Sequence, residues 1–274
     1  MAVKVILLDL DGTLLNSDKT VSAANYAALE RAAAMGVHIV PATGRFYEGM
    51  PKVVRDLPFV RYAVSVNGAE IYDTREKKVL HREELESEEA VAIYEYLTTL
   101  PALCDAYVEG WGYMDRSYYD HVEEFAAQPY VLKMFRELRT PVDDMKGFLA
   151  QHKVQKVMAF FNDMDRRAVE LERVKALFPN TAVSSSISNN IEINAQKATK
   201  GGALLNLCAV LGIDVKDSMA FGDGSNDLSM IRNAGIGVAM GNAYPGLKEA
   251  ADYVTLTCDE DGVAHAINKF VFGE

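Results

Sequence analysis

Two aspartates that lie two residues apart are the side chains best placed for chemistry in this chain. Asp9 and Asp11 directly follow the largely apolar run 3–8, which is typical of a buried strand. In an extended chain, residues i and i+2 point to the same side, so both carboxylates can face one small volume. Like charges this close repel each other unless a cation or a shared proton lies between them. The spacing therefore favours a hard metal ion, or a nucleophile beside an acid/base, although an Asp-Gly pair is also common in simple turns.

Three further clusters follow predicted strands: Thr43-Gly44, Lys200 and the segment 222–227, which reads GDGSND. In a parallel sheet the loops after the strands share one edge, so clusters distant in sequence can converge there. Taken singly, each has an ordinary alternative. Thr43-Gly44 can be a strand–helix turn, Lys200 a solvated lysine with Lys197 as a rival, and 222–227 a helix cap.

Phosphoryl transfer is the chemistry that such a set would serve. Asp9 would attack phosphorus and form an aspartyl-phosphate, while Asp11 would protonate the leaving oxygen and then deprotonate the attacking water. Mg²⁺ would tie Asp9 to the phosphate and neutralise the developing charge, with Asp223 as a further protein ligand.

The remaining clusters supply donors for a phosphoryl group. The Thr43 hydroxyl and the Gly44 N–H can donate hydrogen bonds, and Lys200 adds a compact positive charge at a helix start. Hydrolysis of phosphate monoesters in water is so slow that acceleration can reach ~10²¹. Only a preorganised site with several donors and a metal approaches that figure.

The composition bounds the class of protein. The chain has 274 residues, a net charge of −11 and 49% hydrophobic residues, which is ample for one large core or two smaller ones. The acidic balance argues against nucleic acid or an anionic membrane as a general partner. Three scattered cysteines, with neither a secretory signal nor an apolar run of about 18 residues, predict a cytoplasmic protein without a membrane span.

The order of elements predicts an α/β fold with an inserted domain. Strand-like and helix-like segments alternate regularly in the outer thirds, where Ser22 can cap a helix over 23–35 and a second helix is expected over 46–57. This alternation is typical of a doubly wound parallel sheet. The middle has α+β patterning, so we assign residues 1–82 and 190–274 to the core and 83–189 to the insert.

Four ordered motifs carry a resemblance to the haloacid dehalogenase-like hydrolases, and within them to the Cof-type (subfamily IIB) sugar-phosphate phosphatases. The motifs are residues 9–14 (DLDGTL), 43–45 (TGR), 200–201 (KG) and 222–230 (GDGSNDLSM), and the resemblance covers essentially the whole chain. It implies a Rossmann-like core and an α+β cap domain inserted between the second and third motifs.

The resemblance also implies a role for each motif residue. Asp9 would be the nucleophile and Asp11 the acid/base, with Mg²⁺ held by Asp9, the Asp11 carbonyl and Asp223. Asp227 would orient a metal-bound water or Lys200. Phosphate contacts would come from the Leu10 backbone, Thr43, Gly44, Lys200 and Asn226. One departure is the segment 196–199 (QKAT) before Lys200, where such proteins more often have a Gly-Val-Ser-like stretch.

The cap would select the substrate. Polar side chains alternate along the strand over 189–194, where Asn190 and Glu192 could face the hydroxyls of a sugar; the alternative is a half-exposed strand with a solvent face. Arg45 could bind phosphate or a second anion of the substrate, or form a surface salt bridge.

These observations predict a Mg²⁺-dependent phosphatase that hydrolyses small phosphate monoesters, sugar phosphates first among them. The expected partner is a small phosphorylated metabolite, with no nucleic acid and no membrane, and the expected state is a monomer or weak homodimer. Two alternatives stay open: a phosphosugar mutase that uses the same aspartates, and a non-hydrolytic phospho-acceptor or regulatory binding protein.

Overall fold

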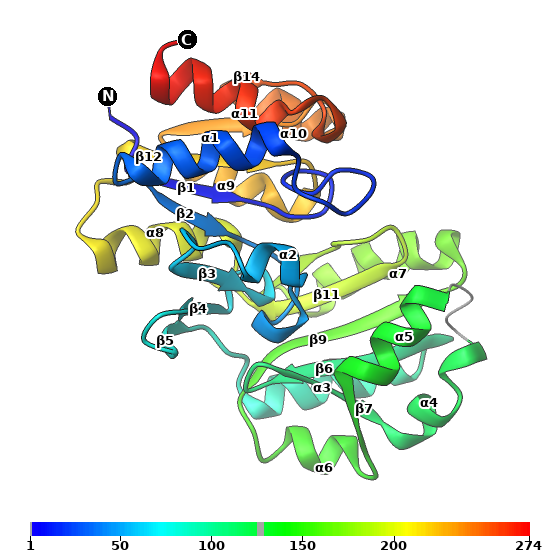
Figure 1. Ribbon diagram of the computed structural model, residues 1–274. Coiled ribbons are helices and arrows are strands. Elements are labelled where there is room, and N and C mark those ends of the chain that lie inside the picture. The colour runs from blue at the N-terminus through cyan, green and yellow to red at the C-terminus, as the bar shows by residue number, and fades with distance from the viewer. Residues whose placement is uncertain (1, 125–128) are drawn as a thin grey trace. The chain divides into compact units, whose positions relative to one another are not determined.

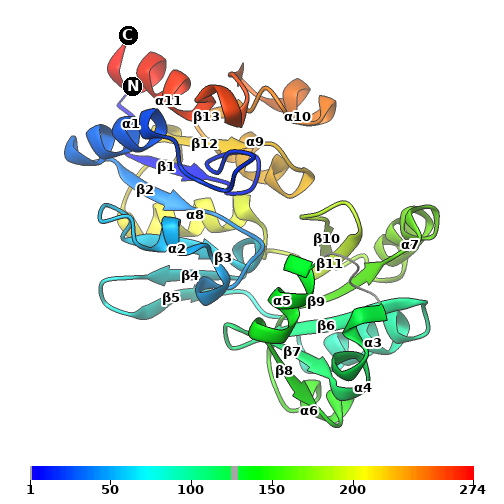
Figure 2. The ribbon, with the colours of Figure 1, turned by 45° about the vertical axis from the view of Figure 1, so that its right-hand side comes forward.

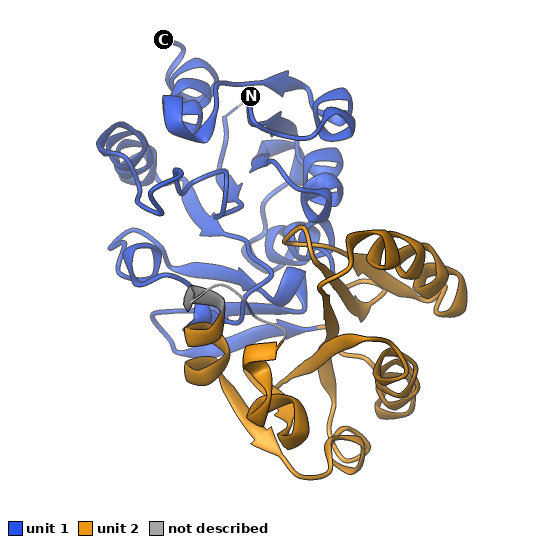
Figure 3. Ribbon diagram, turned by 90° about the vertical axis from the view of Figure 1, so that its right-hand side faces the viewer, with its two compact units in different colours: residues 1–82, 199–274 blue, residues 83–198 orange. Residues whose placement is uncertain are grey.

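The computed structural model describes residues 2–124 and 129–274, and the chain divides into two compact units (Figure 3). Unit 1 comprises Met1–Arg82 and Thr199–Glu274, and unit 2 comprises Glu83–Ala198. From the sequence, the second boundary between the insert and the core was predicted at residue 190. Strand β11 (Asn190–Ala195) pairs with strands of unit 2, so the second boundary lies after this strand.

Unit 1 is built on a five-stranded parallel sheet with the order β14-β13-β12-β1-β2. All four strand pairs are parallel, and β1 lies between β2 and β12 (Figure 1). The expected α/β class with a parallel core sheet is confirmed. The strands are β1 (Val5–Leu8), β2 (His38–Pro41), β12 (Ser218–Gly222), β13 (Ile236–Ala239) and β14 (Tyr253–Val254).

Helices cover both faces of this sheet, because side chains along each strand alternate between two apolar cores. Ile6 and Leu8 of β1 pack in the apolar cluster that includes residues of α1 and α11. Val5 and Leu7 pack in the cluster that includes residues of α8, α9 and α10. The helices are α1 (Ala23–Ala34), α8 (Lys200–Leu211), α9 (Leu228–Asn233), α10 (Pro245–Ala250) and α11 (Gly262–Ile267). Ser22 caps α1 as predicted, since its Oγ accepts from the Asn25 N–H at 3.1 Å.

The segment after β2 differs from the expected helix over 46–57. It forms a 3-10 turn at Tyr47–Gly49 and the short helix α2 (Lys52–Arg55) instead. Pro51 lies between them; a proline has no N–H for the helical ladder and disfavours helical geometry at the residue before it. A three-stranded sheet follows, made of β3 (Tyr62–Ser65), β4 (Glu70–Asp73) and β5 (Lys78–Arg82).

Unit 2 is a six-stranded sheet with the order β10-β11-β9-β6-β7-β8 (Figure 2). All pairs are antiparallel except β7 with β8. The strands are β6 (Ala102–Val108), β7 (Trp111–Asp115), β8 (Arg139–Val142), β9 (Val154–Phe161), β10 (Thr181–Ser184) and β11. The helices are α3 (Ser87–Thr98), α4 (Arg116–Asp120), α5 (Pro129–Leu138), α6 (Met145–Leu149) and α7 (Met164–Leu177).

The apolar core of unit 2 lies on one face of this sheet. Alternate residues of β6, β9 and β11 pack there with residues of α3, α6 and α7, among them Ile93, Leu149 and Val174. The intervening residues of the same strands face the other side, and many of these are polar. Among the described residues, no helix has the length and apolar character needed to cross a membrane.

Candidate active site

The residues after strands β1, β2 and β12 lie at the carboxyl edge of the parallel sheet in unit 1. Asp9 follows β1 directly, and its N–H donates to the Phe221 carbonyl of β12 at 3.0 Å. Asp223 follows the end of β12. The chain after β2 leads to Thr43, whose N–H donates to the Val64 carbonyl at 3.0 Å. This edge is where open parallel sheets of this type bind their ligands.

Lys200 joins the first and fourth motifs through a buried pair of charge-assisted hydrogen bonds. Its Nζ lies 2.5 Å from Oδ1 of Asp9 and 2.6 Å from Oδ1 of Asp227. Lys200 and Asp227 are fully buried. Burial alone would lower the pKa of Lys200, but the carboxylates of Asp227 and Asp9 raise it above its ordinary value. Lys200 therefore carries a fixed positive charge at Asp9, whereas Lys197 is exposed.

Asp227 shapes the loop after β12 as well as holding Lys200. Its Oδ2 accepts from the N–H groups of Asp223 at 2.9 Å and Gly224 at 2.8 Å, while its Oδ1 accepts from Lys200. One carboxylate thus fixes both the backbone that presents Asp223 and the direction of the lysine side chain.

Three carboxylates in unit 1 lie close enough to hold one cation. One oxygen of each of Asp9, Asp223 and Asp227 lies within 4.8 Å of the others. Burial, followed by the charge of Asp227, raises the pKa of Asp223 to about 6. Burial and Asp227 also raise the pKa of Asp9 against the opposing effect of Lys200. Mg²⁺ prefers hard oxygen donors, which these carboxylates supply. A bound cation would also relieve the repulsion between their charges, so these residues fit such an ion.

Asp11 lies outside this carboxylate group and is engaged by two cations. Its Oδ1 accepts from Lys19 Nζ at 2.8 Å, and its Oδ2 accepts from Arg45 Nη2 at 2.9 Å. Burial alone would raise the pKa of Asp11, but Arg45 and Lys19 lower it below the ordinary value. Asp11 is therefore ionised at neutral pH in this arrangement, and Arg45 forms the salt bridge that was the alternative to a substrate contact.

Gly12 allows the loop between Asp11 and Thr13 to approach the fourth motif. It has a φ of +84°, and a Cβ there would lie 2.5 Å from Oδ2 of Asp223. The close approach also brings Thr13 into contact with Asp223, because Thr13 Oγ1 donates to Oδ1 of Asp223 at 2.8 Å. The glycine after the two aspartates is thus required for close contact with Asp223 as well as for the turn.

The predicted phosphate donors Leu10, Thr43, Gly44 and Asn226 lie in the segments that follow β1, β2 and β12. Thr43 is 3% exposed, and its Oγ1 accepts from the Arg45 N–H at 3.3 Å. Leu10 is fully buried, and its carbonyl accepts from the N–H groups of Thr13 and Leu15, so its backbone is held within the first loop. Asn226 follows Asp223 in the segment after β12, and its Nδ2 donates to Oδ1 of Asn67 at 3.3 Å.

Asn67 is a site residue that the sequence did not reveal as one. Asn67-Gly68 predicts only a turn, yet Asn67 contacts Asn226 and its N–H donates to the Thr43 carbonyl at 2.9 Å. Its φ of 59° is in the left-handed region, which asparagine tolerates better than most residues. Gly68 packs so closely against the start of α8 that a Cβ would lie 2.2 Å from the Thr199 carbonyl oxygen.

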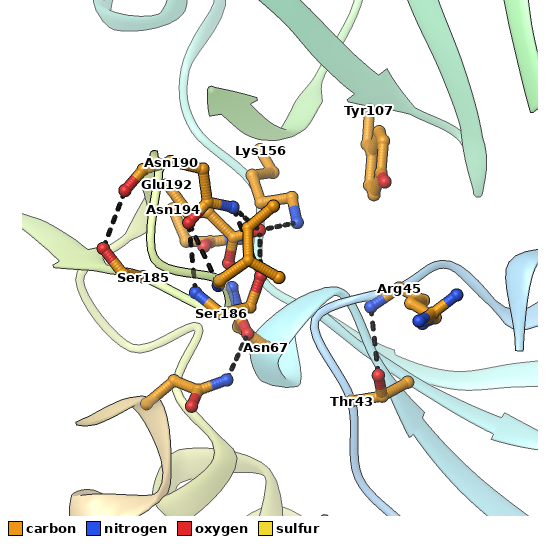
Figure 4. A network of polar contacts seen from close by, with 12 residues as sticks. Thr43, Arg45, Asn67, Tyr107, Lys156, Ser185, Ser186, Asn190, Glu192 and Asn194 are labelled. Carbon is orange, nitrogen blue, oxygen red and sulfur yellow. Dashed lines mark hydrogen bonds and ion pairs between the residues drawn. The ribbon is translucent and has the colours of Figure 1, made fainter. Parts of the chain in front are cut away.

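Asn190 and Glu192 lie on β11 in unit 2, and both are buried, so the alternative of a half-exposed strand with a solvent face is wrong. Oε1 of Glu192 accepts from Lys156 Nζ at 2.8 Å, from Asn190 Nδ2 at 3.1 Å and from Ser186 Oγ at 2.9 Å (Figure 4). The carboxylate is thus surrounded by donors, which satisfies the requirement for a buried charge.

Comparison with known proteins places the chain in a family. A family model for haloacid dehalogenase-like hydrolases matches residues 6–267. The chain is 32% identical over 273 residues to a Bacillus subtilis (strain 168) protein named 5-amino-6-(5-phospho-D-ribitylamino)uracil phosphatase YcsE, covering 98% of this chain and 96% of that protein. It is also 32% identical over 287 residues to Phosphatase YwpJ of the same organism, covering 98% of this chain and 100% of that protein.

Solved structures agree with this placement. A haloacid dehalogenase-like hydrolase from B. subtilis superposes with a TM-score of 0.83 at 32% identity, covering 98% of this chain and 100% of that one. A structure described as a subclass IIB sugar phosphatase gives a TM-score of 0.81 at 25% identity, covering 98% and 99%. The chain belongs to the haloacid dehalogenase-like hydrolase family and is a phosphatase of that family, which confirms the resemblance to its Cof-type members.

Proposed function

We propose that this protein is a Mg²⁺-dependent phosphatase that hydrolyses small phosphate monoesters through an aspartyl-phosphate at Asp9. The observation that carries the proposal is the joining of Asp9, Lys200 and Asp227 by short hydrogen bonds beside Asp223. A nucleophilic carboxylate next to a fixed cation and further carboxylates suits attack on an anionic phosphoryl group.

The reaction proceeds in two steps. In the first, Asp9 attacks phosphorus, the bond from phosphorus to the ester oxygen breaks, and Asp11 protonates the departing oxygen. In the second, Asp11 removes a proton from water, which attacks phosphorus and releases inorganic phosphate and free Asp9. The ion pairs of Asp11 with Lys19 and Arg45 favour its ionised form, which is the form that serves as the base. Movement of Arg45 from Asp11 to an anion of the substrate would favour the protonated form.

The other residues bind and orient the phosphoryl group. Lys200 holds a positive charge beside Asp9, and donors come from the Thr43 hydroxyl, the backbone N–H groups of Leu10 and Gly44, and the Asn226 amide. Asp9, Asp223 and the Asp11 carbonyl would hold Mg²⁺, while Asp227 orients Lys200. When bound, the ion would neutralise charge on the phosphoryl oxygens.

The proposed substrate is a sugar phosphate or a similar small phosphorylated metabolite. One similar protein is named for a phosphorylated ribityl compound, and a similar structure is described as a sugar phosphatase, which supports this class. We assign unit 1 as the catalytic core and unit 2 as the cap, with Asn190 and Glu192 in substrate selection. The proposed setting is the cytoplasm, as a monomer or weak homodimer.

A panel of phosphate monoesters tests the proposal. The wild-type protein with Mg²⁺ should release inorganic phosphate from sugar phosphates, and Asp9→Asn should abolish turnover because the amide cannot attack phosphorus. Asp56→Asn is the matched control, since this aspartate lies exposed after α2 in the same unit. An isomerised sugar phosphate without free phosphate would instead establish a mutase, and retained turnover in Asp9→Asn would contradict the mechanism.

A further inference from the structure

A cavity of about 220 Å³ lies in unit 1 at the amino ends of β2 and β3. The carboxyl ends of the same strands lead to Thr43 and Asn67, so the cavity lies at the opposite edge from Asp9. Its wall includes Ala33 of α1 and Gly36 just after that helix. None of the residues assigned to the proposed phosphatase site lines it.

Aromatic rings and aliphatic side chains form one part of the wall. Phe59, Tyr62 and His38 line the cavity, together with the buried residues Val37 and Ile39. The rings of His38 and Tyr62 lie 5.6 Å apart at 63°. This edge-to-face packing holds both rings in place, so the wall is formed before any ligand enters. Such a surface suits a flat, apolar group.

Phe59 is the third ring of the wall. Its position is fixed by an edge-to-face contact with Tyr26, whose ring centroid lies 5.5 Å from that of Phe59. Burial, followed by the charge of Arg61, lowers the pKa of His38. The imidazole is therefore neutral at pH 7 and adds one ring nitrogen that can accept a hydrogen bond and another that can donate one.

Two arginines supply the charged part of the wall. Nε and Nη2 of Arg61 both donate to Oδ2 of Asp73, at 3.2 and 3.0 Å, which leaves Nη1 without a hydrogen bond to any described residue. Arg75 is exposed in the turn between β4 and β5, and its guanidinium has no ion-pair partner among the residues that the structure describes. Asp73 and the nearby Glu76 both act on Arg61, so Arg75 is the cation at this wall whose charge a ligand would meet.

We propose that this cavity binds a small aromatic anion, namely a single ring that bears one carboxylate group. A cavity of about 150 Å³ is enough to hold benzene, so the present volume admits a ring with a charged substituent. The ring would lie against Phe59, Tyr62 and His38. The carboxylate would accept from Arg75, whose planar fork matches its geometry, and from the single nitrogen Nη1 of Arg61.

The test uses benzoate as the probe, with benzamide as its neutral isostere and acetate as the anion without a ring. Binding to the full-length protein is measured by ligand-observed NMR titration. Benzoate should bind at least about fivefold more tightly than benzamide or acetate, because only benzoate satisfies both parts of the wall.

Two variants locate the binding. Arg75→Ala should weaken benzoate binding by at least about fivefold through loss of an ion pair with a planar donor, while Lys52→Ala, an exposed cation of α2 in the same unit, should change nothing. Ala33→Leu should block the cavity with an extra side chain, and leucine is well tolerated in a helix.

Equal binding of benzoate and benzamide, no binding of benzoate, or unchanged affinity in both Arg75→Ala and Ala33→Leu would overturn the proposal. Thermal unfolding of each variant shows that it is folded, and phosphatase activity serves as an independent reference, because the cavity and the phosphatase site share no residue.

Discussion

At the residue scale, the proposed chemistry depends on Lys200, which is fully buried yet charged. A buried ammonium is costly unless it is paired and hydrogen-bonded, and here Asp9 and Asp227 both accept from it. Asp9 therefore already lies next to a positive charge, and no side chain has to move to bring that charge there. The cost appears in Asp9 and Asp223, whose carboxyl pKa values are both raised by burial and by the charge of Asp227.

Asp223→Asn should stabilise the metal-free protein at neutral pH. In the folded protein the pKa of Asp223 is raised to about 6 from 3.8, so the unfolded chain loses this proton first, and stability falls as pH rises through that interval. Removing the charge should recover about 3 kcal/mol at pH 7.5, the free energy that corresponds to a pKa of about 6 in the folded protein against 3.8 in the unfolded chain, and nothing well below pH 4. Urea unfolding in the presence of a chelator, at both pH values, measures this difference.

The same variant should lose the stabilisation that Mg²⁺ gives to the wild-type protein. Binding at 100 times the dissociation constant stabilises a protein by about 2.7 kcal/mol, and this requires the ligand set to be intact. A destabilised metal-free Asp223→Asn protein, or one that Mg²⁺ still stabilises to the wild-type extent, would argue against Asp223 as a strained metal ligand.

At the scale of elements, local patterns in the sequence predicted what local contacts decide. Ser22 predicted the start of α1 because a cap bonds within three residues of itself. The predicted continuous helix over 46–57 was wrong, because Pro51 separates a 3-10 turn from the short helix α2. Both outcomes depend on interactions a few residues apart.

Features that depend on pairing between distant segments were not predictable in the same way. Asn190 of β11 pairs with Phe160 of β9, thirty residues earlier, and this pairing places the strand in unit 2. Asn67 reads as a turn residue until its contact with Asn226 is known. The motif residues were found because their types and order carry chemistry, and Asp227 was expected beside Lys200 for the same reason. Partners that lie outside the motifs, such as Lys19 for Asp11, require the three-dimensional structure.

Asp73, at the end of β4, makes the turn between β4 and β5 sensitive to pH. Burial alone would raise the pKa of Asp73, but hydrogen bonds from the Glu76 N–H, Arg61 and the Arg75 N–H lower it below the ordinary value. The stability that this charge contributes is present above the pKa of the unfolded chain and is lost as pH falls through the lower pKa of the folded protein.

Asp73→Asn should therefore reduce the free energy of unfolding by about 1.5 kcal/mol at pH 7, the lower end of the usual contribution of hydrogen bonds to a charged group. The deficit should shrink as pH falls below 4. Chemical denaturation at a series of pH values measures it, with the exposed Asp56→Asn as the control. A deficit that is constant with pH would mean that the charge of Asp73 is not what stabilises the turn.

At the scale of the whole molecule, the two units carry different parts of the proposed function. The proposed nucleophile, acid/base and metal ligands all lie in unit 1, whereas the polar cluster of Lys156, Asn190 and Glu192 lies in unit 2. We therefore expect changes in unit 1 to affect every substrate, and changes in this cluster to affect the choice among substrates.

Asn190→Ala should alter the ratio of kcat/KM between different sugar phosphates by about tenfold, the effect of about 1.4 kcal/mol, while kcat with p-nitrophenyl phosphate stays close to wild type. Glu88→Ala is the control, since this glutamate is exposed on α3 of the same unit. A uniform fall of kcat/KM for all substrates would indicate a general structural effect, and an unchanged ratio would remove Asn190 from substrate selection.

The most direct measurement is to locate the phosphoryl group on the enzyme during turnover. The protein is mixed with Mg²⁺ and a sugar phosphate whose phosphorus atom is radiolabelled, and the reaction is quenched in acid within one turnover. The protein is then digested, and the labelled peptide is identified by mass spectrometry. The mechanism predicts label on the peptide that contains Asp9, with the instability to base and hydroxylamine that an acyl phosphate shows, and no label in Asp9→Asn. Phosphate release from the wild-type enzyme without any labelled intermediate, or label on another residue, would contradict it.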